Sequence, residues 1–214
     1  MDDLLISNSE LAKDLLIAAL LAAPVAEVVA TFLGRGRGMG GLRAALAEGL
    51  LLRGRSAAPA DRRTKPLLVL SMFLAVYAAV KIAGDGALTL GADEWGTFVL
   101  GVAAMLAGIA LRSWGIVTLG RFFRREVVVV AGQHVVRRGP YRWIRHPAYA
   151  GNLLLAFGLG LALGSWVGAL VCTAIAFAGH LPRIRVEEAE LTRTLGAEYA
   201  TYADATARLV PGVW

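Results

Sequence analysis

The sequence predicts an all-α integral membrane protein with about five transmembrane helices. Of its 214 residues 57% are hydrophobic, and the mean hydropathy of +0.61 is well above that of an ordinary water-soluble domain. The apolar residues gather in stretches long enough to cross a bilayer, which takes roughly 20 helical residues. Basic residues alternate with acidic ones between those stretches, as in proteins with a fixed orientation in the membrane.

The expected spans follow one another along the chain. Three of them cover about residues 11–33, 67–83 and 95–119, and the apolar stretch 148–181 is long enough for two more. The second span is short, so it must tilt or use its flanking residues to cross the membrane. Small, turn-prone residues in GLALGSWVG divide the last stretch, and we therefore expect a tight helical hairpin there.

The charges predict which side of the membrane each connection lies on. Segment 34–66 carries eight Lys and Arg and segment 120–147 carries seven, whereas segments 1–10 and 84–94 carry none and have three acids each. Because positive connections stay inside, we expect the N-terminus outside, and both basic segments and the C-terminus in the cytoplasm. The net charge of +6 is then explained by orientation, and we expect no nucleic-acid partner.

The sequence also indicates a compartment. The first span follows the acids Asp2, Asp3 and Glu10 rather than a positive segment, so we do not expect a cleaved signal peptide. The single cysteine, Cys172, falls within the hairpin, where a small core residue is expected. The composition, rich in Ala, Gly and Arg, is typical of a bacterial protein, which predicts the inner (cell) membrane.

The sequence predicts the structure of four further features, three between the spans and one within a span. GRGRGMGG follows a membrane helix rather than a strand, so we interpret it as a flexible linker and not as a phosphate loop. LRAALAEGLLLRGRS, which begins at Leu42, predicts a short helix in the membrane interface. The β-branched stretch 127–136 predicts two short strands or a ribbon. Arg112 lies about two turns before the end of its span, where its side chain is expected to extend to the membrane surface.

The segment GPYRWIRHPAYAG, residues 139–151, brings basic and aromatic residues to the start of the hairpin. Proline is favourable at the first position of a helix, so Pro147 predicts a helix that begins there, directly after His146. The N–H groups of residues 148–150 would then face the cytoplasm and offer a seat for a carboxylate or phosphate. Tyr141 and Tyr149 flank that seat and are suited to contact an adenine or a sulfonium cation.

A second polar cluster follows the hairpin in LPRIRVEEAELTRTLGAEYATY. Arg183 and Glu187 are four residues apart and therefore share one helix face. This cluster begins where the hairpin ends, so it is expected to lie beside the segment 139–151, which precedes the hairpin. Gly-x-Glu-Tyr-x-x-Tyr and Pro211-Gly212 predict an ordered tail after it.

These paired motifs, which cover about residues 105–214, resemble the isoprenylcysteine carboxyl methyltransferase family and the wider group of membrane methyltransferases that includes phospholipid methyltransferases. The resemblance implies a small helical bundle whose hairpin and cytoplasmic loops wrap S-adenosylmethionine. It divides the chain into N-terminal membrane helices, 1–94, with the basic loop, and a methyltransferase core, 95–214. The core then holds the span 95–119, a cofactor loop 120–147, the hairpin 148–181 and a tail 182–214, and its activity is at the cytoplasmic side.

The resemblance also implies roles for individual residues. Arg183 would face the substrate, and Arg183 and Glu187 would be the catalytic residues, with no metal. The family commonly has His-x-Leu-Val where this chain begins with Gln133, with His134 one position later, so we expect that stretch to act through its backbone. The implied cofactor-binding residues are Gln133, His134, Val135, Val136, Tyr141, His146, Pro147, Ala148, Tyr149 and Glu187.

The acceptor that the resemblance implies is a lipophilic or lipidated, isoprenylcysteine-like carboxylate within the membrane lipids. A phospholipid amine or a thiol is an alternative acceptor within the same fold; it would first have to lose a proton, to His146 or Glu187. A reductase related to sterol reductases is suggested by the C-terminal Tyr-x-x-Tyr and Pro-Gly. A channel or transporter is disfavoured, because the spans lack a repeat and hold few polar residues besides Asp14, Glu27 and Lys81.

Overall fold

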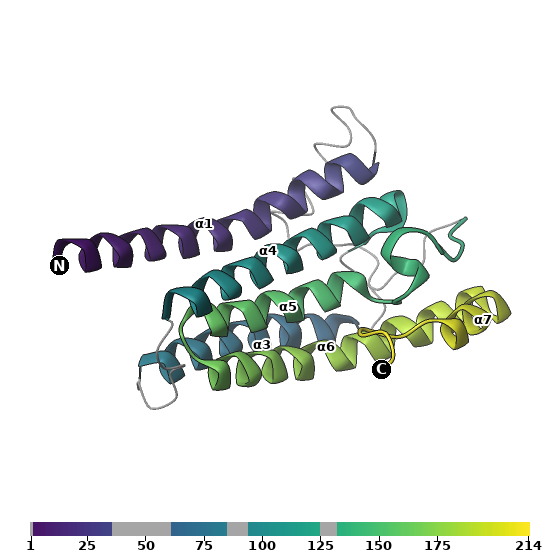
Figure 1. Cartoon of the computed structure of the whole chain (residues 1–214). Coiled ribbons are helices and arrows are strands. Elements are labelled where there is room, and N and C mark those ends of the chain that lie inside the picture. The colour runs from purple at the N-terminus through teal and green to yellow at the C-terminus, as the bar shows by residue number, and fades with distance from the viewer. Residues whose placement is uncertain (1, 36–60, 85–93, 125–131) are drawn as a thin grey trace.

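The structure, a computed structural model, describes residues 2–35, 61–84, 94–124 and 132–214. Its helices in chain order are α1 (Asp2–Arg35), α3 (Asp61–Gly84), α4 (Glu94–Leu119), α5 (Pro147–Ala162), α6 (Trp166–Leu195) and α7 (Ala197–Ala205), with the 3-10 turns η1 (Gly120–Phe122) and η2 (Gly139–Arg142). α4 packs along α5, α3 packs along α6, and α1 lies along the outer side of α4 (Figure 1).

The predicted helical membrane fold is confirmed. Within the part of the chain that the structure describes, four helices are long and apolar enough to cross a membrane, over the ranges Asp14–Gly34, Thr64–Gly84, Trp95–Phe122 and Trp166–Leu195. α5 is apolar but has only 16 residues, fewer than the roughly 20 that a perpendicular span requires. The number of five spans and the orientation of the chain stay predictions.

The predicted hairpin is confirmed at α5 and α6. The chain turns at Gly164, whose φ of +81° favours glycine. Ser165 then caps α6, because its side-chain oxygen accepts a 3.0 Å hydrogen bond from the N–H of Gly168. At the other end of the hairpin Pro147 occupies the first turn of α5, as the sequence predicted.

Glycines allow α4 and α5 to pack with their backbones close together. A Cβ atom on Gly151 would lie 2.5 Å from the carbonyl oxygen of Gly108 and 2.9 Å from the Cβ of Arg112. Such close approach through small residues is typical of helix pairs in membranes, where packing rather than water exclusion drives association. It holds the start of α5 against the last turns of α4, which is where the candidate site lies.

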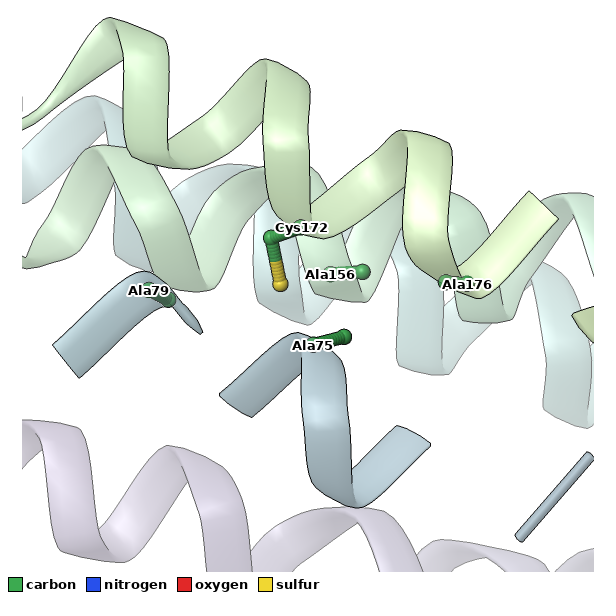
Figure 2. Close-up of a cluster of buried hydrophobic side chains, with 5 residues drawn as sticks. All are labelled: Ala75, Ala79, Ala156, Cys172 and Ala176. Carbon is green, nitrogen blue, oxygen red and sulfur yellow. The ribbon is translucent and has the colours of Figure 1, made fainter. Parts of the chain in front are cut away.

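The contact of α3 with α5 and α6 is built from small side chains (Figure 2). Cys172 of α6 is 1% exposed and lies among Ala75 and Ala79 of α3, Ala156 of α5 and Ala176 of α6. The prediction of a small core residue at Cys172 is therefore confirmed.

Of the expectations for the segments between the spans, one is wrong in its described part, and the others lie outside the described residues. The described part of the predicted ribbon, residues 132–136, contains no strand. The N–H of Val135 donates instead to the carboxylate of Glu198 in α7, so a side chain satisfies the backbone that a partner strand would have paired. The remainder of the ribbon, the predicted interface helix from Leu42 and most of GRGRGMGG lie outside the described residues.

Candidate active site

A cavity of about 320 Å³ opens at the end of the bundle where α4 and α6 end and α5 begins. This volume is within the range of sites that hold small organic ligands. Its lining includes Arg183 and, of the predicted cofactor residues, Gln133, His134, Val135, Val136, Tyr141, His146, Ala148, Tyr149 and Glu187. Pro147 is not in the lining, because its ring lies against Gly115 of α4, where an added Cβ would be 3.1 Å away.

Tyr149 connects the two predicted catalytic side chains. Its hydroxyl donates a 2.7 Å hydrogen bond to Oε2 of Glu187 and accepts one of 3.0 Å from Nε of Arg183. The ring of His146 stacks on the Tyr149 ring, with centroids 5.5 Å apart and planes inclined by 16°. The first turn of α5 and the middle of α6 thus present an anion, a cation and an aromatic surface to one cavity.

The backbone of the C-terminal tail holds the segment before α5 in place. The N–H of Arg145 donates to the carbonyl of Ala207 at 2.8 Å, and the N–H of His146 donates to that of Arg208 at 3.0 Å. The N–H of Ala207 donates in turn to the carbonyl of Trp143 at 3.1 Å, which closes a parallel β-bridge between Ile144 and Ala207. The ordered tail predicted from the sequence is therefore part of the site's framework.

Glu188 joins these pieces through its carboxylate. Oε1 accepts from Nε of Arg145 at 2.9 Å and lies 3.2 Å from Nε2 of His146, and Oε2 accepts from Nε of Arg208 at 2.9 Å. The guanidinium of Arg145 also donates to the carbonyls of Ala203 and Thr206. The sequence predicted no role for Glu188, because nothing in the chain order shows that Arg145, His146 and Arg208 converge on it.

α7 completes the wall of the cavity with residues of the Gly-x-Glu-Tyr-x-x-Tyr motif. Glu198 binds the N–H of Val135 at 3.0 Å, and the hydroxyl of Tyr202 donates to the carbonyl of Tyr141 at 2.7 Å. Burial raises the pKa of Tyr202 to about 12 and also raises that of Tyr141 above its usual value, so both phenols stay protonated at neutral pH. The N–H of Val135 is occupied in this way, and the expectation that the stretch near Gln133 binds a cofactor through its backbone stays a prediction.

One buried polar atom in the lining has no partner within the described residues: the hydroxyl of Tyr199, whose residue is 4% exposed. A buried hydroxyl without a hydrogen bond is costly, so such an atom indicates a missing ligand or water. Together with the acid Glu187 and the stacked rings of His146 and Tyr149, it fits a polar, partly cationic cofactor such as S-adenosylmethionine. Among the described residues no group of His, Cys, Asp and Glu side chains is arranged to hold a metal ion.

The predicted anion seat at the start of α5 is wrong in part. The N–H groups of Tyr149 and Ala150 both donate to the carbonyl of His146, at 3.1 and 3.0 Å. Because the residue that caps the helix already satisfies them, they do not point at a ligand as unpaired donors. Charged side chains line the cavity instead, among them Arg183 and Glu187.

The expectation that Arg112 extends to the membrane surface is also wrong. Its guanidinium pairs with Glu27 of α1, with Nη2 to Oε2 at 2.9 Å, and Nη1 donates to the carbonyl of Ala148 at 3.3 Å. Close packing of α4 on α5 brings that carbonyl within reach. In the same region Nδ2 of Asn152 in α5 lies 3.1 Å from Nε2 of the buried His180 in α6.

The chain is similar to membrane methyltransferases of one family. Residues 99–193 match the model of the isoprenylcysteine carboxyl methyltransferase family. Protein-S-isoprenylcysteine O-methyltransferase A of Arabidopsis thaliana is 31% identical over 123 residues, which are 56% of this chain and 62% of that one. The Saccharomyces cerevisiae protein-S-isoprenylcysteine O-methyltransferase is 33% identical over 106 residues, which are 49% and 44% of the two chains.

The fold is similar to that of a solved structure. The eukaryotic intramembrane Ras methyltransferase superposes with a TM-score of 0.64 at 19% identity, covering 92% of this chain and 65% of the other. The chain thus spans less than two thirds of the length of these three relatives.

Proposed function

We propose that this chain belongs to the isoprenylcysteine carboxyl methyltransferase family and methylates the carboxylate of a lipophilic, isoprenylcysteine-like acceptor, with S-adenosylmethionine as methyl donor. The observation that carries the proposal is the linked set of Arg183, Tyr149 and Glu187 within one cavity at the end of a membrane bundle. It provides one cation for an anionic acceptor and one anion for a cationic cofactor.

The residues that would hold the cofactor lie on α5, α6, α7 and the segment 133–146. Glu187 would bind a donor group of the cofactor, the rings of His146 and Tyr149 would cover an aromatic or cationic part, and the hydroxyl of Tyr199 would gain its missing partner. When bound, S-adenosylmethionine supplies a methyl group on a positively charged sulfur.

Arg183 would orient the acceptor. A carboxyl group with a pKa of about 4 is already ionised at neutral pH, so the chain needs no general base and we assign none. What the protein must do is hold acceptor and donor in line, which lowers a reaction barrier by about 7–11 kcal/mol in the best cases. The charge of both partners falls as they react, and a site screened from water by buried rings suits such a step.

The position of the cavity suits an acceptor that stays in the membrane. Besides its charged and polar residues the lining has apolar side chains from α3, α4 and the last turns of α6: Leu68, Val69, Leu119, Leu191 and Leu195. An isoprenyl chain can contact these residues while its carboxylate reaches Arg183. We further propose that residues 95–214 form the methyltransferase core, that residues 1–94 complete its membrane part, and that the active site faces the cytoplasm of a bacterial cell.

An amine or thiol acceptor would require a base, and the side chains near the cavity are poorly placed for one. Nε2 of His146 lies against the carboxylate of Glu188, to which it donates, and Glu187 accepts the hydroxyl proton of Tyr149. A base takes a proton from the acceptor, and Glu187 could do so only by losing its hydrogen bond from Tyr149. The other ring nitrogen of His146, Nδ1, lies 3.9 Å from Oε2 of Glu187 and so faces this carboxylate.

The test is an assay of the full chain in lipid nanodiscs with S-adenosylmethionine labelled in its methyl group. Three acceptors are compared: N-acetyl-S-farnesylcysteine, a phosphatidylethanolamine and an alkanethiol. We expect label in a base-labile ester of the first acceptor and at most background label in the others. Transfer to the amine or thiol without ester formation would overturn the carboxylate proposal.

A further inference from the structure

A second cavity, of about 240 Å³, lies on the membrane side of the first, between α1, α4 and α5. Much of its wall is small or apolar, with Ala23 and Pro24 of α1, Gly108 and Ile109 of α4, and Leu155 of α5. Glu27, Arg112 and Asn152 line this cavity and also the candidate active site. These three polar residues therefore stand between the two cavities.

The ion pair of Glu27 with Arg112 is unusual in its surroundings. Both residues belong to helices apolar enough to span a membrane, and their side chains are 14% and 21% exposed. Ionisable residues at such places are costly and are commonly part of a site where a substrate or ion passes. Pairing reduces that cost, so a process that separates the two must supply another partner for Arg112.

The geometry of the pair leaves room for such an exchange. Nε and Nη2 of Arg112 both donate to one oxygen of Glu27, Oε2, at 3.2 and 2.9 Å. A guanidinium binds a carboxylate most strongly when two parallel N–H groups meet two different oxygens. A second carboxylate that entered the active site could adopt that arrangement, and Arg112 would remain neutralised throughout.

The acceptor's carboxylate is placed to be that second anion. Nη1 of Arg112 donates to the carbonyl of Ala148, the residue before Tyr149, whose hydroxyl accepts from Arg183. Arg112 from α4 and Arg183 from α6 thus both line the cavity, one on each side of α5. Glu27 lines the second cavity as well, so its carboxylate has space to withdraw toward Ser113 and Asn152.

We propose that Arg112 is a second acceptor-binding residue, and that the acceptor's carboxylate displaces Glu27 from it. The inference rests on the proposed function and deepens it, because it explains how the site selects its acceptor. An anionic acceptor takes the place of Glu27 beside Arg112, so the guanidinium stays paired with a carboxylate. A neutral or cationic acceptor leaves Arg112 paired with Glu27 and gains no contact with it.

Direct binding tests the exchange without methyl transfer. The full chain in nanodiscs is titrated with N-acetyl-S-farnesylcysteine and with its uncharged carboxamide, both in the absence of cofactor. The wild type should bind the carboxylate at least about tenfold more tightly than the carboxamide. Arg112→Gln should remove most of that ratio by weakening only the carboxylate, and Arg112→Lys, which keeps the charge but lacks the planar fork, should recover part of it.

The direction in which Glu27→Gln changes the affinity for the carboxylate is the decisive result. If Glu27 competes with the acceptor, its removal should tighten carboxylate binding severalfold and leave carboxamide binding unchanged. If the pair serves only to hold α1 on α4, Glu27→Gln should weaken both ligands or neither, and that result would overturn the proposal. Lys81→Gln removes an exposed positive charge at the opposite end of α3, so it is the net-charge control for Arg112→Gln and should alter neither affinity.

Two further measurements keep the outcomes distinct. The double variant Glu27→Gln with Arg112→Gln removes both charges, so it should melt close to the wild type yet lack the carboxylate preference. Recovery of the preference in that variant would show a purely structural pair and would also overturn the proposal. If the wild type transfers methyl groups but Arg112→Gln keeps the wild-type ratio of carboxylate to carboxamide affinity, this inference alone is refuted. If the wild type binds no S-adenosylmethionine, the proposed function is refuted, and the affinity ratio still reports on the anion site.

Discussion

α1 and the C-terminal tail both pack against the centre of the bundle, but different forces hold them there. α1 buries small residues such as Ala19 and Ala30 against α4 and exposes Leu21, Val25 and other large apolar side chains on its outer face. The tail after α6 is fixed by backbone hydrogen bonds to residues 143–146 and by the ion pairs of Glu188. Directional bonds therefore define the geometry where chemistry is proposed, whereas shape and an ion pair hold the helix that faces lipid.

The largest effect should come from breaking the polar attachment of the tail. Glu188→Ala leaves Arg145, Arg208 and His146 without their shared anion, and removing one partner of a largely buried pair costs roughly 3–5 kcal/mol. We expect a large fall in the melting temperature of the protein in detergent and loss of S-adenosylmethionine binding, measured by thermal shift and calorimetry.

Glu190→Gln is the matched control for that variant. Glu190 pairs with Arg193, whose side chain is 73% exposed, and surface pairs contribute only about 0–1 kcal/mol. Equal stability losses in the two variants would mean that Glu188 does not organise the tail.

Arg183 and Glu187 should separate acceptor use from cofactor binding. Arg183→Ala should lower kcat/KM for the acceptor about ten- to hundredfold, because a charged hydrogen bond is worth roughly 1.5–3 kcal/mol, and should leave cofactor affinity nearly unchanged. Arg183→Lys should recover part of the activity. Glu187→Gln should instead raise the dissociation constant of S-adenosylmethionine.

Since Tyr149 links these two residues, the comparison has to be made in both assays. Were Arg183→Ala to lose the cofactor as severely as Glu187→Gln while sparing the acceptor, the assigned roles would be reversed.

A smaller effect distinguishes two neighbouring tyrosines of α7. Tyr199→Phe removes a buried hydroxyl that has no partner among the described residues, so the fold should not lose stability, whereas cofactor affinity should fall a few-fold. Tyr202→Phe removes the hydrogen bond to the carbonyl of Tyr141 and should cost about 1 kcal/mol of stability. Calorimetry for binding and thermal shift for stability give the two readings, and an unchanged cofactor affinity in Tyr199→Phe would exclude a contact with its hydroxyl.

The predicted orientation of the chain in the membrane can be tested with fusions that leave its own residues unchanged. Reporters fused after residue 90 and after residue 214 should report opposite sides of the membrane, with the second in the cytoplasm, because the basic segments predict that arrangement. Two reporters on the same side would contradict the predicted orientation.

Much of the fold could be predicted because apolar runs and glycine-rich turns are local signals. The hairpin, the start of α5 at Pro147 and the burial of Cys172 follow from them directly. The ribbon at 127–136 shows the opposite case, since the preference of Val for strands reflects a pleated, packed surface, and Val135 bonds to a side chain instead. The β-branched residues of this stretch do not by themselves show whether a strand or a side chain will pair with its backbone.

The predicted site residues came from motif resemblance, and the structure gathers nearly all of them around one cavity. The roles of Glu188 and Arg112 could not be predicted, because each depends on a partner far away in sequence. Glu27 is 85 residues from Arg112, and Arg145 is 43 from Glu188. No spacing rule brings such pairs together until the helices are packed.

The bonds from Arg145 and His146 to Ala207 and Arg208 have a consequence for biosynthesis. At about 5–20 residues per second, a ribosome adds Arg208 roughly 3–12 s after His146. During that interval the N–H groups of Arg145 and His146 lack these two partners. The framework of the candidate active site can therefore form only after the tail has been synthesised.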